Sequence, residues 1–350
     1  MRIAGIGVAV PSQAVANDDI LRAVERERPR DAWSGAIARS ILNLLEAAGA
    51  ETRFHRAPGE LARDLTRTAM QDALAQSGLR PHDIDLLIHC SIGRGFIEPG
   101  NAYFCANLLG MRCDCFDIAD ACMGWLRAAN LAYDGIAVGR HRRVMVVNTE
   151  FGAQQQLAYG YQIGHPLELR RKFTAFTLGE VAAATVFEGS DESWSFTYRS
   201  RPDLFDLCTV PLPGHTSFAA DSARLAGAKP LQLDAHSGEL FAAAEDEMCA
   251  LLAETLSDLD APDLYVPHSA SSTASVAAAR RAGLPLHKLF TSIMPRFGNV
   301  ASASLPLGLF CASREGALPS NADVVLCPAS AGVCVGIGRF RWDGGAHVAG

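Results

Sequence analysis

Short apolar runs alternate with helical patterns along the chain, and each run has the length of one β-strand. The runs are apolar almost throughout, which is typical of strands that are buried on both faces of a largely parallel sheet. Eight runs stand out: 3–10, 84–91, 113–119, 143–150, 182–189, 263–269, 323–330 and 334–342. The alternation of these strands with helices predicts an α/β fold.

Two distant segments of the chain repeat one pattern. Residues 60–91 and 239–270 each predict a helix, a short acidic connection, an apolar strand and a polar strand end. A repeat at a distance near half the chain length indicates a duplicated domain, because the repeats of solenoid proteins are much shorter. We expect an N-terminal half over 1–190 and a C-terminal half over 191–350, which meet near 190–230 where the pattern is interrupted.

The composition narrows the class of protein. The 350 residues, 49% of them hydrophobic and 20% charged, are those of a soluble globular protein with room for two domain-sized cores. The 31 basic and 38 acidic side chains give a net charge of −7, so we expect no nucleic-acid partner. Pro11 ends the apolar run at the N-terminus, and no apolar stretch approaches the roughly 20 residues that span a bilayer. We therefore expect a cytoplasmic protein with no membrane partner.

The ten cysteines lie mostly inside apolar runs, which suits a reducing compartment better than a disulfide framework. The closest pair, Cys113 and Cys115, has no second pair and no histidine nearby, so a zinc site is not expected. The GIG of the first run lacks the third glycine and the following helix of a dinucleotide-binding fingerprint. The sequence therefore predicts neither a metal nor a cofactor.

Cys122 stands where the predicted strand 113–119 ends and a helical pattern begins. The apolar positions after it recur on one helix face until Gly139: Met123, Leu126, Ala129, Tyr133 and Ile136. Backbone N–H groups at a helix N-terminus stabilise a thiolate, the form of cysteine that attacks carbonyl carbon. The pattern alone leaves two interpretations open, a catalytic nucleophile and a buried, unreactive cysteine.

Two polar residues of the second half stand in comparable places. His268 ends the strand of LYVPHS, and Asn299 occupies the glycine turn of FGNVASAS. A histidine after proline and an asparagine after glycine are each common in turns, so neither identifies a site alone. Residues beyond the carboxyl ends of strands in an α/β sheet converge on the ligand crevice. We therefore expect Cys122, His268 and Asn299 to lie close together.

The motifs DACMGW, VPHSAS and FGNVASAS follow one another with separations of 146 and 31 residues between the Cys, His and Asn. In this order they resemble the β-ketoacyl-acyl carrier protein synthase III branch of the thiolase superfamily. The resemblance extends over nearly the whole chain, from GIGVAVP to PASAGVCVGIGRFRW. It implies the thiolase-like five-layered αβαβα fold made of two duplicated halves, and it implies a homodimer.

The resemblance also implies an acyl-enzyme mechanism. Cys122 would take an acyl group from a thioester of coenzyme A or acyl carrier protein, and a second substrate would then attack the acyl-enzyme. In decarboxylating members a malonyl thioester loses CO2, and His268 Nε2–H and the Asn299 amide would donate hydrogen bonds to the enolate oxygen. The backbone N–H groups of Cys122 and of the Ser-Ala-Gly turn around Ala331 would hold the acyl oxyanion.

The sequence departs from the family pattern around each motif. His268 is usually followed by Gln-Ala-Asn and a basic residue, whereas Ser-Ala-Ser-Ser-Thr occupies 269–273 here, so contacts to phosphopantetheine and carrier protein are altered. The usual Gly-Asp-Gly-Ala-Gly stretch reads Gly-Glu-Val-Ala-Ala at 179–183. Asp120 precedes the Ala-Cys pair where the housekeeping enzymes have a smaller residue. These changes favour a specialised, secondary-metabolite relative.

Three residues are candidates for the substrate tunnel. Segment 94–111 matches the family segment that crosses the dimer interface and caps the partner's acyl tunnel. This match would place Ile97 and Glu98 at the end of the tunnel. Trp125 either narrows the acyl pocket or belongs to the core beneath its helix.

Three functions stay open. The first is Claisen condensation, with or without decarboxylation, which the retained Asn299 favours. The second is acyl transfer to a hydroxyl or amine of a small-molecule acceptor, with His268 as general base, which the altered carrier contacts favour. The third, a partner subunit without catalysis, is disfavoured because Cys122, His268 and Asn299 are all present. Neither a G-x-S-x-G elbow nor a papain-type cysteine motif occurs in the sequence.

Overall fold

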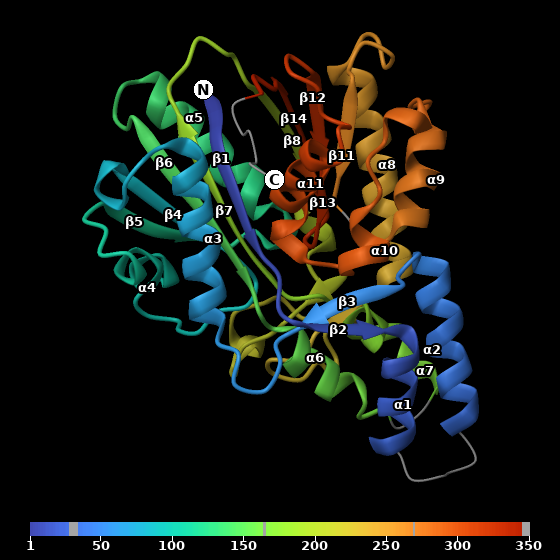
Figure 1. Ribbon diagram of the computed structural model, residues 1–350. Helices are drawn as coiled ribbons and strands as arrows, with labels where there is room; N and C mark the ends of the chain where they lie inside the picture. The colour runs from blue at the N-terminus through green and yellow to red at the C-terminus, as the bar shows by residue number, and fades with distance from the viewer. Residues whose placement is uncertain (28–33, 164–165, 269, 345–350) are drawn as a thin grey trace.

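The computed structural model describes residues 1–27, 34–163, 166–268 and 270–344, and its strands form two five-stranded sheets (Figure 1). The first sheet consists of β1 (Arg2–Ala9), β4 (Leu86–Cys90), β5 (Asp114–Ile118), β6 (Arg143–Glu150) and β7 (Val181–Glu188). The second consists of β8 (Ser195–Ser200), β11 (Leu264–Pro267), β12 (Asp323–Cys327), β13 (Ala329–Ser330) and β14 (Cys334–Arg341). Each of the eight predicted strands is confirmed by one of these elements.

Both sheets are mixed, so the expectation of largely parallel sheets is wrong. In the first sheet, ordered β1-β7-β6-β4-β5, β4 is parallel to β5 and β6, whereas β7 is antiparallel to β1 and β6. In the second sheet only β11 and β12 are parallel, and β14 is antiparallel to β8, β12 and β13. The strands are apolar because helices cover both faces of each sheet, and this covering does not depend on strand direction.

Helices divide the molecule into five layers. α3 (Ala62–Ser77) covers the outer face of the first sheet at β1 and β7, and α8 (Ser237–Thr255) with α9 (Ser272–Ala282) covers the second sheet. Between the sheets lie α5 (Gly124–Ala137), which contacts β4 and β6, and α11 (Ser304–Arg314), which contacts β1 and β11 (Figure 1). The largest apolar core joins this central layer to both sheets. The order is the expected αβαβα.

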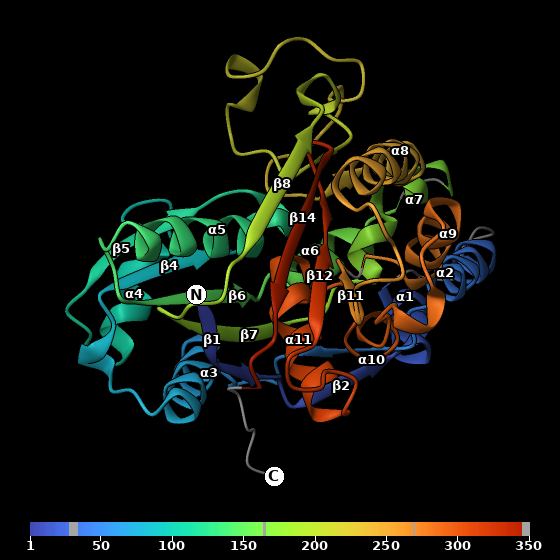
Figure 2. The same cartoon turned by 90° about the horizontal axis from the view of Figure 1, so that it is seen from above.

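Further elements surround the layers. Near the lower end of the view in Figure 1 lie β2 (Gln13–Ala16), β3 (Thr52–His55), α1 (Asn17–Glu27), α2 (Ser34–Ala48), α6 (Ala153–Gly160) and α7 (Pro166–Lys172). The remaining helices are α4 (Asn101–Leu108), beside β5, and α10 (Ile293–Phe297), beside β3. The short strands β9 (Cys208–Thr209) and β10 (Asp234–Ala235) pair with each other, and much of the segment between them projects from the layers in Figure 2.

The two sheets come from separate parts of the chain. Every strand of the first sheet lies between Arg2 and Glu188, and every strand of the second lies between Ser195 and Arg341. Trp194, at the end of the connection between the sheets, packs its ring 3.9 Å from that of Phe340, whereas most of residues 189–193 are exposed. We propose the division near residue 190 on this basis.

Candidate active site

Cys122 lies in a tight 3₁₀ turn, η2 (Ala121–Met123), that joins β5 to α5. The turn is held from the second half of the chain, because Met123 N donates to Ser330 Oγ at 3.3 Å and Ser330 Oγ donates to the Asp120 carbonyl at 3.3 Å. Cys122 as a residue is partly exposed, although its thiol is desolvated. The turn therefore presents the sulfur at the start of a buried helix, as the sequence predicts.

The pKa of Cys122 is not lowered, as a thiolate at a helix N-terminus would require. Burial raises the pKa of the Cys122 thiol well above its usual range, and the nearby Glu150 carboxylate raises it further. Desolvation therefore outweighs the stabilisation that a helix N-terminus gives to a thiolate. The resting side chain is a neutral thiol, and it must pass its proton to another group when it attacks a thioester.

His268 follows the last residue of β11 and is buried. Its Nδ1 lies 2.9 Å from the hydroxyl of Ser304, the first residue of α11. Burial lowers the pKa of His268 to about 4, so the ring is neutral at pH 7. When the Ser304 hydroxyl donates to Nδ1, the one ring proton is on Nε2, and the imidazole presents an N–H donor on its other side.

Asn299 is fixed through its backbone and its side-chain oxygen. Its N–H donates to the Thr177 carbonyl at 2.8 Å, its own carbonyl accepts from Gly179 N at 3.0 Å, and Oδ1 accepts from Ala301 N at 3.0 Å. Because Oδ1 is engaged, the NH2 group is the part of the amide that can meet a ligand. Gly298 before it has φ 69°, and a Cβ there would lie 2.4 Å from the Thr177 carbonyl, so the turn requires glycine.

The three residues surround one short turn, η7 (Ala301–Ala303). Turn η2, which carries Cys122, contacts η7 directly. Asn299 precedes η7 by two residues, and the Ser304 hydroxyl that binds His268 follows η7 immediately. The fold therefore brings the nucleophile candidate and both donor candidates to the same place.

Backbone strain gathers at this place as well. Of the five non-glycine residues with positive φ in the described chain, Ala121 (43°), Ala301 (44°) and Val333 (45°) each flank a predicted site motif. Such a conformation costs about 1–3 kcal/mol and persists where the surrounding structure enforces it. Val333 follows the Ser-Ala-Gly turn, whose Ser330 holds η2, so this turn with Ala331 lies beside the nucleophile.

Known proteins share this arrangement of sequence and fold. Residues 252–342 match the family model described as 3-Oxoacyl-[acyl-carrier-protein (ACP)] synthase III C terminal. The β-ketoacyl-[acyl-carrier-protein] synthase III of Methylococcus capsulatus is 27% identical over 351 residues, which cover 97% of this chain and 98% of the relative. That of Symbiobacterium thermophilum is 28% identical over 357 residues, with 97% of each chain covered. The chain is thus similar to β-ketoacyl-[acyl-carrier-protein] synthase III over nearly its whole length.

Solved structures confirm the thiolase-like fold of the ketosynthase III-like chain. The 3-oxoacyl-[acyl-carrier-protein] synthase III of Aquifex aeolicus superposes with a TM-score of 0.77 at 22% identity, over 97% of this chain and 99% of that one. A single-residue variant of OleA from Xanthomonas campestris gives a TM-score of 0.81 at 20% identity, over 97% and 98%. The fold predicted from the sequence is therefore correct.

The residues that replace the usual ketosynthase III contacts after His268 have structural partners. Ser271 caps α9, since its Oγ accepts from Ala274 N at 3.2 Å. Ser272 Oγ donates to the carbonyl of Ala48, and Thr273 Oγ1 donates to the carbonyl of Ala47, so both bind the end of α2. Ser269 lies outside the described residues. The hydroxyls fasten α9 to α2.

Two further departures also have structural partners. The buried Glu180 carboxylate accepts from Arg56 N at 2.9 Å and from Arg56 Nε at 3.2 Å, which fixes the end of β3. Asp120 Oδ2 accepts from Arg127 Nε at 2.9 Å, and the Arg127 guanidinium lies over the Tyr198 ring at 3.8 Å. Asp120 therefore ties the nucleophile turn to α5.

The tunnel candidates lie in two different environments. Trp125 is fully buried, donates from Nε1 to Thr185 Oγ1 at 3.0 Å and packs against Phe187. These are the contacts of a core residue, and its part in a tunnel stays a prediction. Ile97 is 79% exposed and Glu98 is also exposed. Within one chain neither closes a cavity, so their predicted place at a tunnel end depends on a partner subunit.

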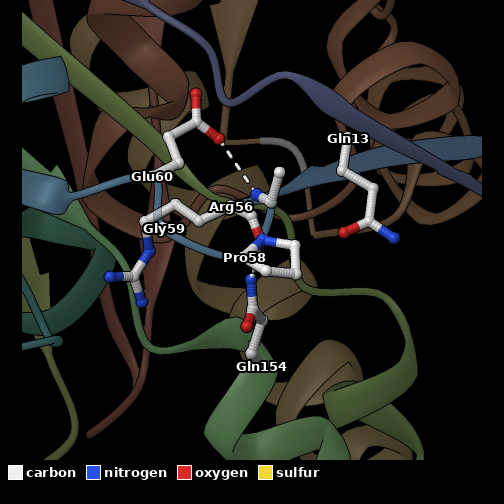
Figure 3. A pocket seen from close by; sticks show the side chains of 7 residues that line it. Gln13, Arg56, Pro58, Gly59, Glu60 and Gln154 are labelled. Carbon is white, nitrogen blue, oxygen red and sulfur yellow. Dashed lines mark hydrogen bonds between the residues drawn. The ribbon is translucent and has the colours of Figure 1, made fainter.

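A surface cavity of about 320 Å³ has none of the three predicted residues in its lining (Figure 3). Its lining comes from β2, the segment after β3 and α6: Gln13, Arg56, Ala57, Pro58, Gly59, Glu60 and Gln154. Its polar groups already have partners, because Gln154 Nε2 donates to the Arg56 carbonyl and Glu60 accepts from Ala57 N.

Among the described residues, no cluster of three or more His, Cys, Asp or Glu could hold a metal ion, and no helix is long and apolar enough to cross a membrane.

Sequence analysis missed the side-chain contacts that hold the site together, although it placed Ser330 in the predicted oxyanion turn. Ser304 orients His268, Ser330 holds the nucleophile turn, and Glu150 binds Ser302 of η7. Glu150 ends the apolar run 143–150, so the rule that polar residues at strand ends face the crevice could have identified it. The serines carry no such signal, because small hydroxyl residues occur throughout the chain.

Proposed function

We propose that the chain is a cytoplasmic condensing enzyme that forms a carbon–carbon bond from two acyl thioesters through an acyl group on Cys122. The observation that carries the proposal is the convergence on η7 of the thiol on turn η2, a neutral histidine and an oriented asparagine amide. The 27% identity to a β-ketoacyl-[acyl-carrier-protein] synthase III supports the reaction class. The replaced residues after His268 support a specialised, secondary-metabolite substrate.

In the first half-reaction, the Cys122 sulfur attacks the carbonyl carbon of an acyl thioester delivered by coenzyme A or an acyl carrier protein. The thiol proton passes to the departing thiolate of the carrier, and the acyl group stays on sulfur. The negative charge that develops on the carbonyl oxygen needs donors at the nucleophile. The backbone N–H groups of Cys122 and of the turn at Ala331 supply them.

In the second half-reaction, an enolate attacks the acyl carbon on Cys122. Loss of CO2 from a malonyl thioester generates this enolate, and its oxygen gains charge as the C–C bond of the carboxylate breaks. His268 Nε2–H and the Asn299 NH2 group donate to that oxygen. The enolate carbon then bonds to the acyl carbon, and Cys122 leaves as a thiolate that takes up a proton.

Acyl transfer to the hydroxyl or amine of a small metabolite is the second candidate. The replaced carrier contacts around Ser271 favour it, because such a reaction needs no second carrier-bound substrate. It would use His268 as general base, and burial lowers the pKa of His268 to about 4, far below neutral pH. A group with a pKa this low is a weak proton acceptor. The site therefore supports condensation better than acyl transfer catalysed by a general base.

The test is a two-step assay on the purified protein. Incubation with a panel of acyl-coenzyme A and acyl carrier protein thioesters, followed by intact mass measurement, shows which acyl group is loaded. Addition of malonyl-coenzyme A then yields CO2 and a β-keto product, whereas Cys122→Ala yields neither. Transfer of the acyl group to an added alcohol or amine without CO2 release would support the second candidate instead. Absence of any acyl adduct would contradict both.

We also propose a homodimer built on the surface around α4. Large apolar side chains are exposed there: Ile92, Phe96, Ile97, Tyr103, Phe104 and Phe116. Phe96 stacks on Phe104 at 4.3 Å, and β5 beside them is the edge strand of the first sheet. Contiguous apolar surface next to a free sheet edge is typical of an interface between subunits. Sedimentation at micromolar concentration should give twice the 37.3 kDa of one chain, and a monomer would contradict the proposal.

A further inference from the structure

Glu150 is a buried carboxylate at the end of β6 that the proposed reaction does not use. One of its oxygens accepts from Ser302 N at 3.2 Å and from the Ser302 hydroxyl, and both oxygens lie 3.3 Å from Ile92 N. Glu150 is only 5% exposed, so its carboxylate is buried. Burial raises the pKa of Glu150, and its hydrogen bonds oppose that rise. All of its donors belong to two short segments.

The first of these segments is η7. Ser302, its middle residue, also accepts from Asn148 Nδ2 at 2.8 Å, and the same amide group donates to the Cys90 carbonyl at 3.0 Å. Turn η7 is therefore fastened to the ends of β6 and β4. It begins with the strained Ala301, whose N–H orients the side chain of Asn299.

The second segment begins at Ile92, two residues after the end of β4. It continues into the exposed residues Phe96 and Ile97 on the proposed dimer surface. One carboxylate therefore binds the turn that orients Asn299 and the segment that leads to the subunit interface. The hydrogen bonds that join the two run through Glu150, Ser302 and Asn148.

We infer that Glu150 is a positioning residue for the second half-reaction, holding η7 so that the Asn299 amide meets the enolate oxygen. The inference rests on the proposed function. Glu150 acts through Ser302 and Ala301 and does not itself touch substrate. A misplacement of η7 by a fraction of an ångström leaves the thiol of Cys122 in place but moves the donor that only the second step needs.

The experiment compares the two half-reactions in four variants of the full chain. Glu150→Ala should slow condensation about 100-fold and Glu150→Gln about 10-fold. Acylation of Cys122 should not be slowed, because loss of the carboxylate removes one cause of the raised pKa of the thiol. Ser302→Ala keeps the backbone donor and should slow condensation only about threefold. Glu188→Gln is the matched control, because Glu188 binds Arg143 at the opposite end of β6 and should leave both steps unchanged.

A double-mutant cycle separates positioning from a general loss of structure. If Glu150 acts through Asn299, Glu150→Ala should slow condensation from preloaded acyl-enzyme by less than about threefold further in an Asn299→Ala background, because preloading removes any effect of the carboxylate on the Cys122 thiol. Additive losses, or equal losses in both half-reactions, would overturn the inference. Should Glu150→Ala fail to fold, the near-isosteric Glu150→Gln carries the same test.

Failure of the inference can be told from failure of the proposed function. A wild-type enzyme that condenses, together with Glu150 variants that condense equally fast, would overturn the positioning role alone. A wild-type enzyme that loads Cys122 but never forms a C–C bond would overturn the proposed function, and the inference with it.

Discussion

Turns η2 and η7 are built alike, one in each half of the chain. Each is a three-residue 3₁₀ turn that begins with an alanine in the left-handed region, Ala121 at φ 43° and Ala301 at φ 44°. Each runs directly into a helix of the central layer, and the two turns contact each other. Cys122 and Ser302 therefore occupy equivalent positions.

The two central residues differ in what they bind. Cys122 as a residue is partly exposed, whereas Ser302 is fully buried and its hydroxyl is bound to Glu150 and Asn148. The duplicated framework thus supplies two equally strained turns, of which the first carries the covalent chemistry. The second is held in place by hydrogen bonds. Beside it, Asn299 is one proposed donor and Ser304 orients the other, His268.

The largest expected effect comes from replacing each of the two central residues with alanine and comparing the losses. Cys122→Ala should abolish acyl loading and product formation, because no other thiol stands at this turn. Ser302→Ala should retain both steps and slow condensation only about threefold, since the backbone N–H still binds Glu150. Steady-state product formation measures both variants. Comparable losses in the two would contradict the division of roles between the turns.

The next effect concerns the donor beside η7. Asn299→Ala should slow condensation by about 10²–10³, the usual cost of one lost oxyanion donor, and leave acylation of Cys122 nearly intact. Single-turnover measurements with preloaded acyl-enzyme separate the two steps. Asn130→Ala, on the exposed side of α5, is the control. Near-wild-type product formation without CO2 release would favour acyl transfer over condensation.

A smaller effect follows from the burial of neutral His268. Its folded pKa of about 4 lies below the value of about 6.5 in the unfolded chain, so the unfolded state binds the proton first as the pH falls. The free energy of unfolding of the wild-type protein should therefore fall by about 2 kcal/mol between pH 7 and pH 5 because of this group. The His268→Gln variant should lack this part of the fall. Urea unfolding at both pH values measures the difference. Equal losses in the two proteins would contradict the neutral burial of His268.

The same pKa sharpens the kinetic distinction between the candidates. The rate of condensation should show no inflection near pH 6.5, because His268 stays neutral down to about pH 4. A pH–rate profile of the second half-reaction with a required base near 6.5 would instead favour acyl transfer by a histidine with its ordinary pKa.

The smallest effect is expected at Asp120, which is one of the departures from the family pattern. Its ion pair with Arg127 is one-third exposed on both sides, and such pairs contribute about 0.2–1 kcal/mol. Asp120→Ala should lower stability by no more than this amount and change condensation little. Thermal unfolding and product formation test it. A loss as large as that of Asn299→Ala would show that Asp120 takes part in the reaction.

Local patterns predict the α/β strands and the places of Cys122, His268 and Asn299, whereas the five layers follow from the resemblance to the synthase III family. Buried strands appear as apolar runs, and the candidate residues stand at the ends of strands or in turns. The direction of β7 and β14 leaves no such mark, so the sheets were wrongly expected to be largely parallel. The sequence does not predict strand β8, because the strand is only half-buried and contains no continuous apolar run.

The electrostatics of the site could not be predicted from local pattern. The pKa of the Cys122 thiol depends on its desolvation and on Glu150, and that of His268 depends on burial by surrounding elements. The bond between Glu150 and Ser302 joins residues 152 positions apart. Contacts of this range arise only once both halves of the chain have packed together.

Peptide mapping of the acyl-enzyme tests the central claim most directly. After brief exposure to the acyl thioester that loads best, proteolysis and mass spectrometry should place the acyl group on Cys122 alone among the ten cysteines, with Cys113 and Cys115 as internal controls. Ser302, the equivalent residue of the second turn, should carry none. An acyl group on any other residue, or a Cys122→Ala variant that still forms product, would contradict the account.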